Sequence, residues 1–419
     1  MCDRLGRGPG RPPLLHHSLP AIAAPTQAWS DPDGGMRDGA HGVHHAGVRW
    51  ICGLSLTVDG RGVEPLSSVD HDGRVTFRGL VGGLDGARAE HRVVVHRTRE
   101  AWSRGLVERI TIENGQEVPV AIMLELELEV CGSPVDAIAG GRPEHGDVDI
   151  AELPAGALVR SGERSMAVTS EGGAVRVRGR RIVVSRRAIV RDGDWATLDV
   201  ELEFDDPAVD DRASTVELSA PPLTGRPALD RWTARAVSDI ETLLLDVGHG
   251  PVPAASAPWR LGILARDAIG AARLLLPVDP RPAAGVLRTL AAHQGVRVDA
   301  RSGEEPGRMP NALERGGDYR SLDATPAWVV LLHDAWRAGM PLDAVRELRP
   351  ALHASLAWMI ERIGEGYLGR LPTGPYEEWL PPAAEGDDAR EWFPVDAQAL
   401  AHAAAAAAAE PAHRARRRR

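Results

Sequence analysis

The chain has 419 residues and a formal net charge of −10 at pH 7, and it contains no lysine, so every Lys-or-Arg position is arginine. A net-acidic chain without a basic patch argues against a nucleic-acid-binding protein. No stretch approaches the roughly 20 consecutive apolar residues of a membrane-spanning helix. The length predicts two domains, because a single hydrophobic core stops growing near about 250 residues.

The three cysteines, Cys2, Cys52 and Cys131, lie far apart in the sequence and have no CxxC or His-paired spacing. Neither a disulfide framework nor a zinc site is therefore predicted, and this cysteine usage fits a reducing cytosol. The apolar run near the N-terminus is too short and too interrupted for a signal peptide. We predict a cytoplasmic protein with a disordered segment over residues 1–34.

Residues 35–217 predict an antiparallel β-sandwich. In "VAIMLELELEV", residues 120–130, leucines alternate with glutamates, which is the pattern of a strand with one buried face. "WATLDVELEF" repeats it, and many short strands between Gly, Asp and Ser turns indicate a sandwich. The dipeptide Asn114-Gly115 predicts a two-residue hairpin turn between the strands on either side of it. His41, His44 and His45 are interpreted as surface residues rather than metal ligands.

A proline-rich linker over residues 218–228 precedes a helical domain over residues 229–410. Apolar residues then recur at intervals of three and four, and the helices joined by Pro and Gly suggest paired helices in a bundle or toroid. The predicted helices are 229–246, 261–276, 281–294, 324–339, 342–363 and about 395–410. A basic, structureless tail is predicted over residues 411–419.

"SAPWRLGILARDAIGAARLLLPVDP", residues 256–280, places Trp259 just before a predicted helix that carries Arg266 and Asp267. A charged pair in so apolar a helix needs partners. Two interpretations remain open: a buried structural ion pair with a core tryptophan, or a site for a polar ligand.

A long connection over residues 294–328 also concentrates polar side chains, and such loops tend to be functional. Carboxylates and an arginine beside aromatic rings suit a sugar site, whereas the alternative is a solvated acidic loop. Asp323 is predicted either to cap the following helix or to bind a ligand. The residues of interest are Asp299, Glu304, Glu305, Arg308, Asp318, Tyr319 and Asp323.

"SAPWRLGILARDAIGAARLLLP", "LRTLAAHQGVRVDARSGEEPGRM" and "SLDATPAWVVLLHDAW" occur in the order in which similar segments occur in bacterial glycogen-debranching, amylo-α-1,6-glucosidase-like proteins. The chain resembles this family from about residue 35 to about residue 365. The resemblance implies a β-sandwich followed by an (α/α)6 toroid with a glucose pocket. It places Trp259, Arg266 and Asp267 in the glucosyl subsite, Glu304 and Glu305 on the pocket rim, and Asp323 at the start of the next helix.

The chain departs from the family pattern at the positions that would carry catalysis. Asn311 and Ala312 stand where the family usually has a His-Glu pair. A later Gly-Trp-Lys-Asp-Ser signature matches only at Trp379, and the nearby acids Glu377, Glu378, Asp387 and Asp388 are out of register. The catalytic acid and base are therefore unknown, and the toroid is predicted to be incomplete. A truncated product, a partner that completes the barrel and a loss of catalysis all remain open.

The sequence predicts a β-then-α multidomain protein, an antiparallel β-sandwich followed by an incomplete (α/α)6 toroid. The resemblance implies a glycogen-debranching α-glucosidase that hydrolyses α-glucosidic bonds, chiefly α-1,6 bonds, with inversion of configuration. Because the acid-base pair is incomplete, hydrolysis is expected to be impaired. The alternative is a non-catalytic carbohydrate-binding or partner protein that retains the glucose subsite. An α-glucan or oligosaccharide is the expected binding partner. No metal or cofactor is expected, and neither is binding to nucleic acid or to a membrane. Homo-oligomerisation stays open.

Overall fold

The computed structural model describes residues 14–417 except 38, 72, 85–91, 143, 208–215, 221, 314–316, 365, 367 and 369–393. The chain divides into two compact units. The first comprises Met1–Asp211 and Ser256–Leu261, and the second comprises Arg212–Ala255 and Gly262–Arg419.

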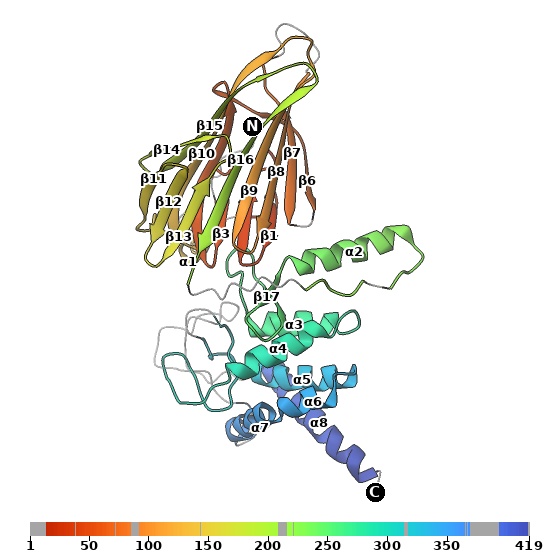
Figure 1. The fold of residues 1–419 in the computed structure, drawn as a ribbon. Coiled ribbons are helices and arrows are strands. Elements are labelled where there is room, and N and C mark those ends of the chain that lie inside the picture. Colours follow the sequence, from red (N-terminus) through yellow and green to blue (C-terminus); the bar gives the residue numbers. More distant parts are fainter. Residues whose placement is uncertain are drawn as a thin grey trace. The chain divides into compact units, whose positions relative to one another are not determined.

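The first unit contains two antiparallel sheets that face each other (Figure 1). In order across the first sheet, the strands are β1 (Leu19–Ala23), β2 (Thr26–Ser30), β3 (Gly42–His45), β4 (Val48–Val58), β10 (Val120–Pro134), β15 (Arg181–Val190) and β14 (Ala174–Arg178), with β5 (Arg61–Gly62) beside β4. Across the second they are β11 (Asp149–Leu153), β12 (Gly156–Ser161), β13 (Arg164–Thr169), β16 (Asp194–Asp205), β9 (Gly105–Asn114), β8 (Val93–Trp102), β7 (Arg74–Leu80) and β6 (Glu64–His71). A short helix α1 (Val135–Ala139) follows β10.

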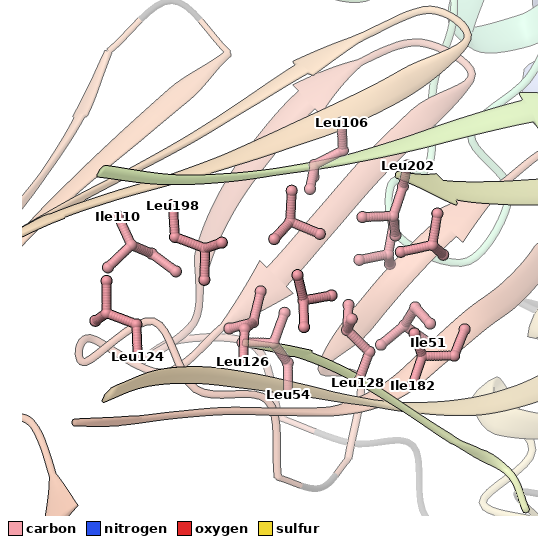
Figure 2. Packing of buried hydrophobic residues seen from close by; sticks show 14 of the residues in the cluster. Ile51, Leu54, Leu106, Ile110, Leu124, Leu126, Leu128, Ile182, Leu198 and Leu202 are labelled. Carbon is pink, nitrogen blue, oxygen red and sulfur yellow. The ribbon is translucent and has the colours of Figure 1, made fainter. Parts of the chain in front are cut away.

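The core of the sandwich follows from the alternation in the two central strands. Leu124, Leu126 and Leu128 of β10 are fully buried, while the glutamates between them are only partly buried. From the opposite sheet, Leu198 and Leu202 of β16 point toward these leucines (Figure 2). The predicted β-sandwich is therefore confirmed.

The predicted hairpin at Asn114-Gly115 is wrong. Strand β9 ends at Asn114 and pairs with β8 and β16, whereas β10 lies in the other sheet and pairs with β4 and β15. The buried Asn114 amide donates to the carbonyls of Val118 and Val190, both at 2.9 Å, and its Oδ1 accepts from the Gln116 N–H at 3.0 Å. The dipeptide thus builds a corner between sheets, because side-chain bonds and distant strands outweigh the local turn preference.

Residues within the segment predicted to be disordered form the paired strands β1 and β2. Ala21 and Ala28, one from each strand, are fully buried in the sandwich core. Strand pairing here depends on β3 as the neighbour of β2, a contact between residues distant in sequence. The short, Pro-containing run carries no alternation that would have predicted it.

The histidines interpreted as surface residues are buried instead. His44 and His45 are 1% and 2% exposed, and His41 is 9% exposed. His45 stacks on the Phe204 ring with centroids 4.6 Å apart, and burial lowers the pKa of His45 to about 3. These histidines belong to the core because β3 lies inside its sheet.

In the described residues of the second unit, the regular elements are helices and one short strand pair, β17 (Leu244–Asp246) and β18 (Pro251–Pro253). Its helices are α2 (Pro227–Glu241), α3 (Ala265–Leu275), α4 (Arg281–Ala292), α5 (Ala324–Arg337), α6 (Leu342–Glu347), α7 (Arg349–Ile363) and α8 (Val395–Arg417). Helices following a sandwich is the predicted order, and it is confirmed.

Several helices differ in extent from the sequence prediction. The helix predicted over 229–246 ends at Glu241, and Leu244–Asp246 forms strand β17 instead, while the helix predicted over 261–276 begins at Ala265. The helix predicted over 342–363 is two helices, α6 and α7, because Pro350 occupies the first turn of α7 and cannot continue the hydrogen-bond ladder of a preceding helix. Helix α8 continues to Arg417, into the range predicted to be a structureless tail. Alanine and arginine both have high helix propensity, which favours a helix over the alanine run and the arginines that follow it.

Helix α5 is the centre of the helical unit. Ten of its residues are buried, and it contacts α3, α4, α7 and α8. Trp328 on α5 is fully buried, and its Nε1 donates to the Leu287 carbonyl of α4 at 3.0 Å. A helix that is apolar on most sides must be covered on most sides, so the start of α5 is held in a fixed position within this unit.

Candidate functional site

The first turn of α3 carries Arg266 and Asp267 on its outer face. The core-facing residues of α3 recur at helical spacing, namely Ala265, Ala268, Ile269, Ala272 and Leu275. Arg266 and Asp267 fall between them, and both are exposed. The interpretation of the two as a buried ion pair is therefore wrong.

Arg266 is paired instead with Asp323, the residue that precedes α5. The Arg266 Nε donates to Asp323 Oδ2; the arginine side chain is 48% exposed and the aspartate side chain 8%. Burial opposes the charge on Arg266, but the hydrogen bond and charge of Asp323 outweigh it and raise the Arg266 pKa. The result is a cation that is held by a largely buried carboxylate and is still about half exposed.

Asp323 occupies the N-cap position of α5 but makes no capping hydrogen bond with its side chain. Its Oδ1 accepts from the Ser321 hydroxyl, and the N–H of Ala324 lies 3.3 Å from that hydroxyl oxygen. Of the two roles predicted for Asp323, the cap is taken by Ser321. The Asp323 carboxylate positions Arg266.

A further acidic residue, which sequence reasoning missed, belongs to the same site. The charge of Asp396, in the first turn of α8, acts on Arg266 together with that of Asp267. Both aspartates are exposed. Arg266 thus contacts Asp323 at the start of α5 and lies within electrostatic range of Asp267 on α3 and Asp396 on α8. No sequence signal links α3 to α8, because their approach depends on helix packing.

Glu304, predicted on the pocket rim, is folded back onto its own loop. It is 8% exposed, and its carboxylate accepts from the Val296 N–H at 3.1 Å and from Arg297 Nε at 3.0 Å. The Val296 hydrogen bond, reinforced by Arg297 against the effect of burial, lowers the Glu304 pKa. Glu304 therefore stabilises the conformation of its own loop.

Glu305 ties the same loop to α7. Its carboxylate accepts from Trp358 Nε1 at 2.6 Å and from Arg362, and lies 3.7 Å from Arg308. Arg308 is buried, with its guanidinium 5.3 Å from the Trp358 ring centroid, and burial lowers its pKa to about 10. This cluster is a packed ion network that joins loop and helix.

The side chains of Tyr319, Asp318 and Asp299 in the same loop also have hydrogen-bond partners. The Tyr319 hydroxyl donates to the His293 carbonyl at 2.7 Å, and Arg320 Nε donates to Asp318 at 2.9 Å. Asp299 accepts from the Ser302 hydroxyl at 3.0 Å. In its described residues, the connection predicted as a functional or solvated loop is held by hydrogen bonds and ion pairs of its own side chains.

Trp259 lies in the hexapeptide Ser256–Leu261, which belongs to the first unit. The residue is partly buried, and the preceding Pro258 carbonyl accepts from the Gln27 side chain at 2.9 Å. Of the predicted site residues, the structure thus brings Arg266 and Asp323 into contact and places Asp267 next to Arg266. Glu304 and Glu305 make separate contacts.

Residues 22–208 match the family model described as the N-terminal domain of some glycogen debranching enzymes. These residues form most of the β-sandwich. The resemblance predicted from the sequence is confirmed over this domain.

No curated protein matches the chain. Among solved structures, a protein described as a kojibiose phosphorylase from the human microbiome aligns with 81% of the chain at 8% identity and a TM-score of 0.49. The chain spans 56% of the length of that phosphorylase. A galactose mutarotase-like protein from Clostridium acetobutylicum aligns with 45% of this chain and 95% of its own, at 6% identity and a TM-score of 0.33.

The position where the debranching family usually has a His-Glu pair adjoins α3. The Asn311 carbonyl accepts from the Ala265 N–H at 2.8 Å, one residue before Arg266, and the Asn311 side chain donates to Asp318 at 3.4 Å. Trp379 and the acids Glu377, Glu378, Asp387 and Asp388 lie outside the described residues. Among the described residues no cluster of three or more His, Cys, Asp or Glu side chains suits a metal ion, and no helix there is both long and apolar enough to cross a membrane.

Proposed function

We propose that the chain is a glycogen-debranching-type protein that binds glucosyl units of α-glucans, and that its hydrolytic activity is impaired. The observation that carries this proposal is the family match over residues 22–208, which ties the sandwich to debranching enzymes. The reaction of such a glucosidase would be inverting hydrolysis of α-1,6 bonds. We also propose a cytoplasmic location, on the ground of the cysteine usage.

The arrangement around Arg266 supports saccharide binding in the helical unit. Carboxylates accept paired sugar hydroxyls, and a guanidinium donates in a planar fork. Arg266 is held by the largely buried Asp323 yet remains 48% exposed. Exposed Asp267 and Asp396 add acceptors next to it. We propose Arg266, Asp267 and Asp396 as sugar ligands, with Asp323 as the residue that positions Arg266.

The carboxylates of the 294–323 loop support impaired hydrolysis. An inverting glucosidase needs two carboxyl groups about 6.5–9.5 Å apart, and its general acid needs a raised pKa. The Glu304 pKa is lowered, and Glu305 is occupied by Trp358 and Arg362. Asn311 and Ala312 offer no carboxyl group. These facts equally favour the second candidate, a carbohydrate-binding protein without catalysis.

Two measurements on the full chain separate these functions. Glucose release from a branched dextrin measures hydrolysis, and calorimetric titration with maltose or isomaltose measures binding. We expect saccharide binding with slow or no glucose release. Rapid release would overturn the impairment, and no binding to any α-glucan would overturn the proposal as a whole.

Trp259 is proposed as a residue that stacks on a sugar ring. The test is Trp259→Ala, with Trp232→Ala on α2 as the control because Trp232 is 68% exposed. We expect weaker saccharide binding for Trp259→Ala and unchanged binding for Trp232→Ala. Equal affinities in both variants would contradict stacking of a sugar ring on Trp259.

A further inference from the structure

Two cysteines that are distant in sequence lie on neighbouring strands of the sandwich. Cys52 is in β4 and Cys131 is in β10, and these strands pair in antiparallel orientation. Cys52 is partly exposed, whereas Cys131 is 1% exposed. Both are free thiols in this structure.

The contacts of the two sulfur atoms bring them to the same point of the sheet. Cys52 Sγ lies 3.6 Å from the Glu129 carbonyl oxygen, two residues before Cys131. Cys131 Sγ lies 3.1 Å from the Arg49 carbonyl oxygen and 3.8 Å from that of Trp50, two residues before Cys52. Each thiol is also within hydrogen-bonding reach of the other.

A β-bulge explains how these side chains meet. The register between β10 and β4 shifts between Glu129 and Val130 and again before Ser133. A bulge inserts an extra residue in one strand and redirects its side chains. Glu129 pairs with Gly53 and Val130 pairs with Ile51, so Cys52 is the extra residue of β4 at the first shift. Cys131 lies at the second shift, and it is buried together with the adjacent Val130.

The charges around the pair favour one thiolate. The hydrogen bond with Cys52 lowers the Cys131 pKa, and the nearby positive charge of Arg49 assists against the opposing effect of burial. Donation of the shared hydrogen bond and burial raise the Cys52 pKa. Thiolate character controls the reactivity of cysteine toward oxidants.

We propose that Cys52 and Cys131 form an oxidation-sensitive pair that closes into a reversible disulfide when the protein meets a peroxide. The thiolate of the pair attacks a peroxide oxygen, the O–O bond breaks, and a sulfenic acid forms with release of one water. The second thiol displaces the sulfenic hydroxyl as another water, and the S–S bond forms. The pair loses two electrons and two protons, and hydrogen peroxide is reduced to two waters. A dithiol reductant reverses the reaction by exchange.

The disulfide would join β4 to β10 and close a loop of about 80 residues, which restricts the unfolded chain. We therefore expect the oxidised sandwich to unfold at a higher temperature than the reduced one. Strands β4 and β10 lie at the centre of the first sheet, so the cross-link acts on the core of the domain.

The test uses the full chain with Cys2→Ser, which leaves these two cysteines as the only thiols. The protein is treated with hydrogen peroxide, denatured, alkylated and analysed by mass spectrometry. We expect both thiols to be lost together, a mass decrease of two hydrogens, and peptides containing Cys52 and Cys131 joined until reduction. The unfolding temperature should rise on oxidation and return after dithiothreitol.

Cys2→Ser/Cys52→Ser is the control, because it retains Cys131 without its partner. It should gain oxygen or keep its thiol, and its unfolding temperature should not rise with peroxide. The proposal is overturned if the Cys2→Ser protein keeps both alkylatable thiols, gains oxygen without a cross-link, or links only between two chains.

Discussion

Each unit contains an arginine-carboxylate cluster, and the two clusters differ most in their exposure. In the sandwich, Glu108 of β9 accepts from Arg97 and Arg99 of β8, with side-chain exposures of 0%, 3% and 0%. In the helical unit, Arg266 is 48% exposed beside Asp323. The first cluster is sealed in protein, whereas the second is open on one side.

This difference separates a structural role from a binding role. The sealed cluster is enclosed by protein groups, since Arg99 donates to the Gly34 carbonyl at 2.8 Å and both guanidinium groups lie within 5.6 Å of the Phe77 ring centroid. One nitrogen of each guanidinium, Arg97 Nη2 and Arg99 Nη1, is buried without a hydrogen-bond partner among the described residues. Removing one charge there leaves another charge buried without a partner. Around Arg266 water can replace a lost partner, and so can a sugar hydroxyl. Exposure, more than charge, identifies the candidate site.

The largest expected effect comes from breaking the sealed cluster. Glu108→Gln should lower the free energy of unfolding of the sandwich by about 3–5 kcal/mol, because two buried arginines lose their counter-charge. Urea unfolding followed by circular dichroism measures it. Glu113→Gln on the same strand is the control, since Glu113 pairs with His96 at 3.0 Å but is 57% exposed. Its effect should stay below about 1 kcal/mol. Equal losses in the two variants would contradict the comparison.

Acid should weaken the sealed cluster as well. Burial alone would raise the Glu108 pKa, but Arg97 and Arg99 outweigh it and lower the pKa. A depressed folded-state pKa contributes stability above the unfolded value, about 4.3, and this stability is lost as the pH falls through the folded value. The urea concentration at half-unfolding of the wild type should therefore decrease when the pH is lowered below about 4. In Glu108→Gln the urea midpoint should decrease less over the same pH range. An equal decrease in both proteins would show that the cluster is not the source of the pH dependence.

An intermediate effect is expected where a loop is tied to the helical unit. Glu305→Gln weakens the contacts with Trp358, Arg362 and buried Arg308, and should lower the free energy of unfolding of that unit by about 1.5–3 kcal/mol. Glu347→Gln is the control, because Glu347 is 61% exposed and 3.5 Å from Arg288. Saccharide binding by Glu305→Gln, measured well below its unfolding midpoint, should persist, since Glu305 is not proposed as a ligand.

The sequence predicted best where periodicity continues over a whole element. The alternation in residues 120–130 predicted the buried face of β10, and the spacing of apolar residues predicted α3 and α5. At Asn114 the same reasoning failed, because the dipeptide preference is worth less than the pairing of two strands with partners in different sheets. Local signals do not report which sheet a strand joins.

The candidate site was predicted only in part for the same reason. Arg266 and Asp323 were identified as residues of interest, but their contact joins residues 57 apart in sequence. Asp396 carries no local signal that connects it to Arg266. Glu304 and Glu305 were assigned to a pocket rim by resemblance, whereas their partners, Arg297 and Trp358, are set by the path of the loop.

The smallest effect on stability, and the sharpest test of function, comes from two matched arginines on α3. Arg266 pairs with Asp323, and Arg273 pairs with Asp334 at 2.8 Å with a similar side-chain exposure of 45%. Both pairs join α3 to α5 or its start. Arg273→Ala should cost less than about 1 kcal/mol of stability, and Arg266→Ala about 1–2 kcal/mol, because it leaves the Asp323 carboxylate, 8% exposed, without its cation. Only Arg266 is flanked by Asp267 and Asp396.

Calorimetric titration with maltose or isomaltose should therefore distinguish the two variants. Arg266→Ala should bind about tenfold more weakly than the wild type, equivalent to about 1.4 kcal/mol, while Arg273→Ala should bind as the wild type does. If both variants lose affinity equally, the loss reflects the α3–α5 junction, and the assignment of Arg266 as a sugar ligand is wrong. If neither loses affinity, the exposed face of Arg266 does not contact the saccharide, and the open cluster is structural like the sealed one.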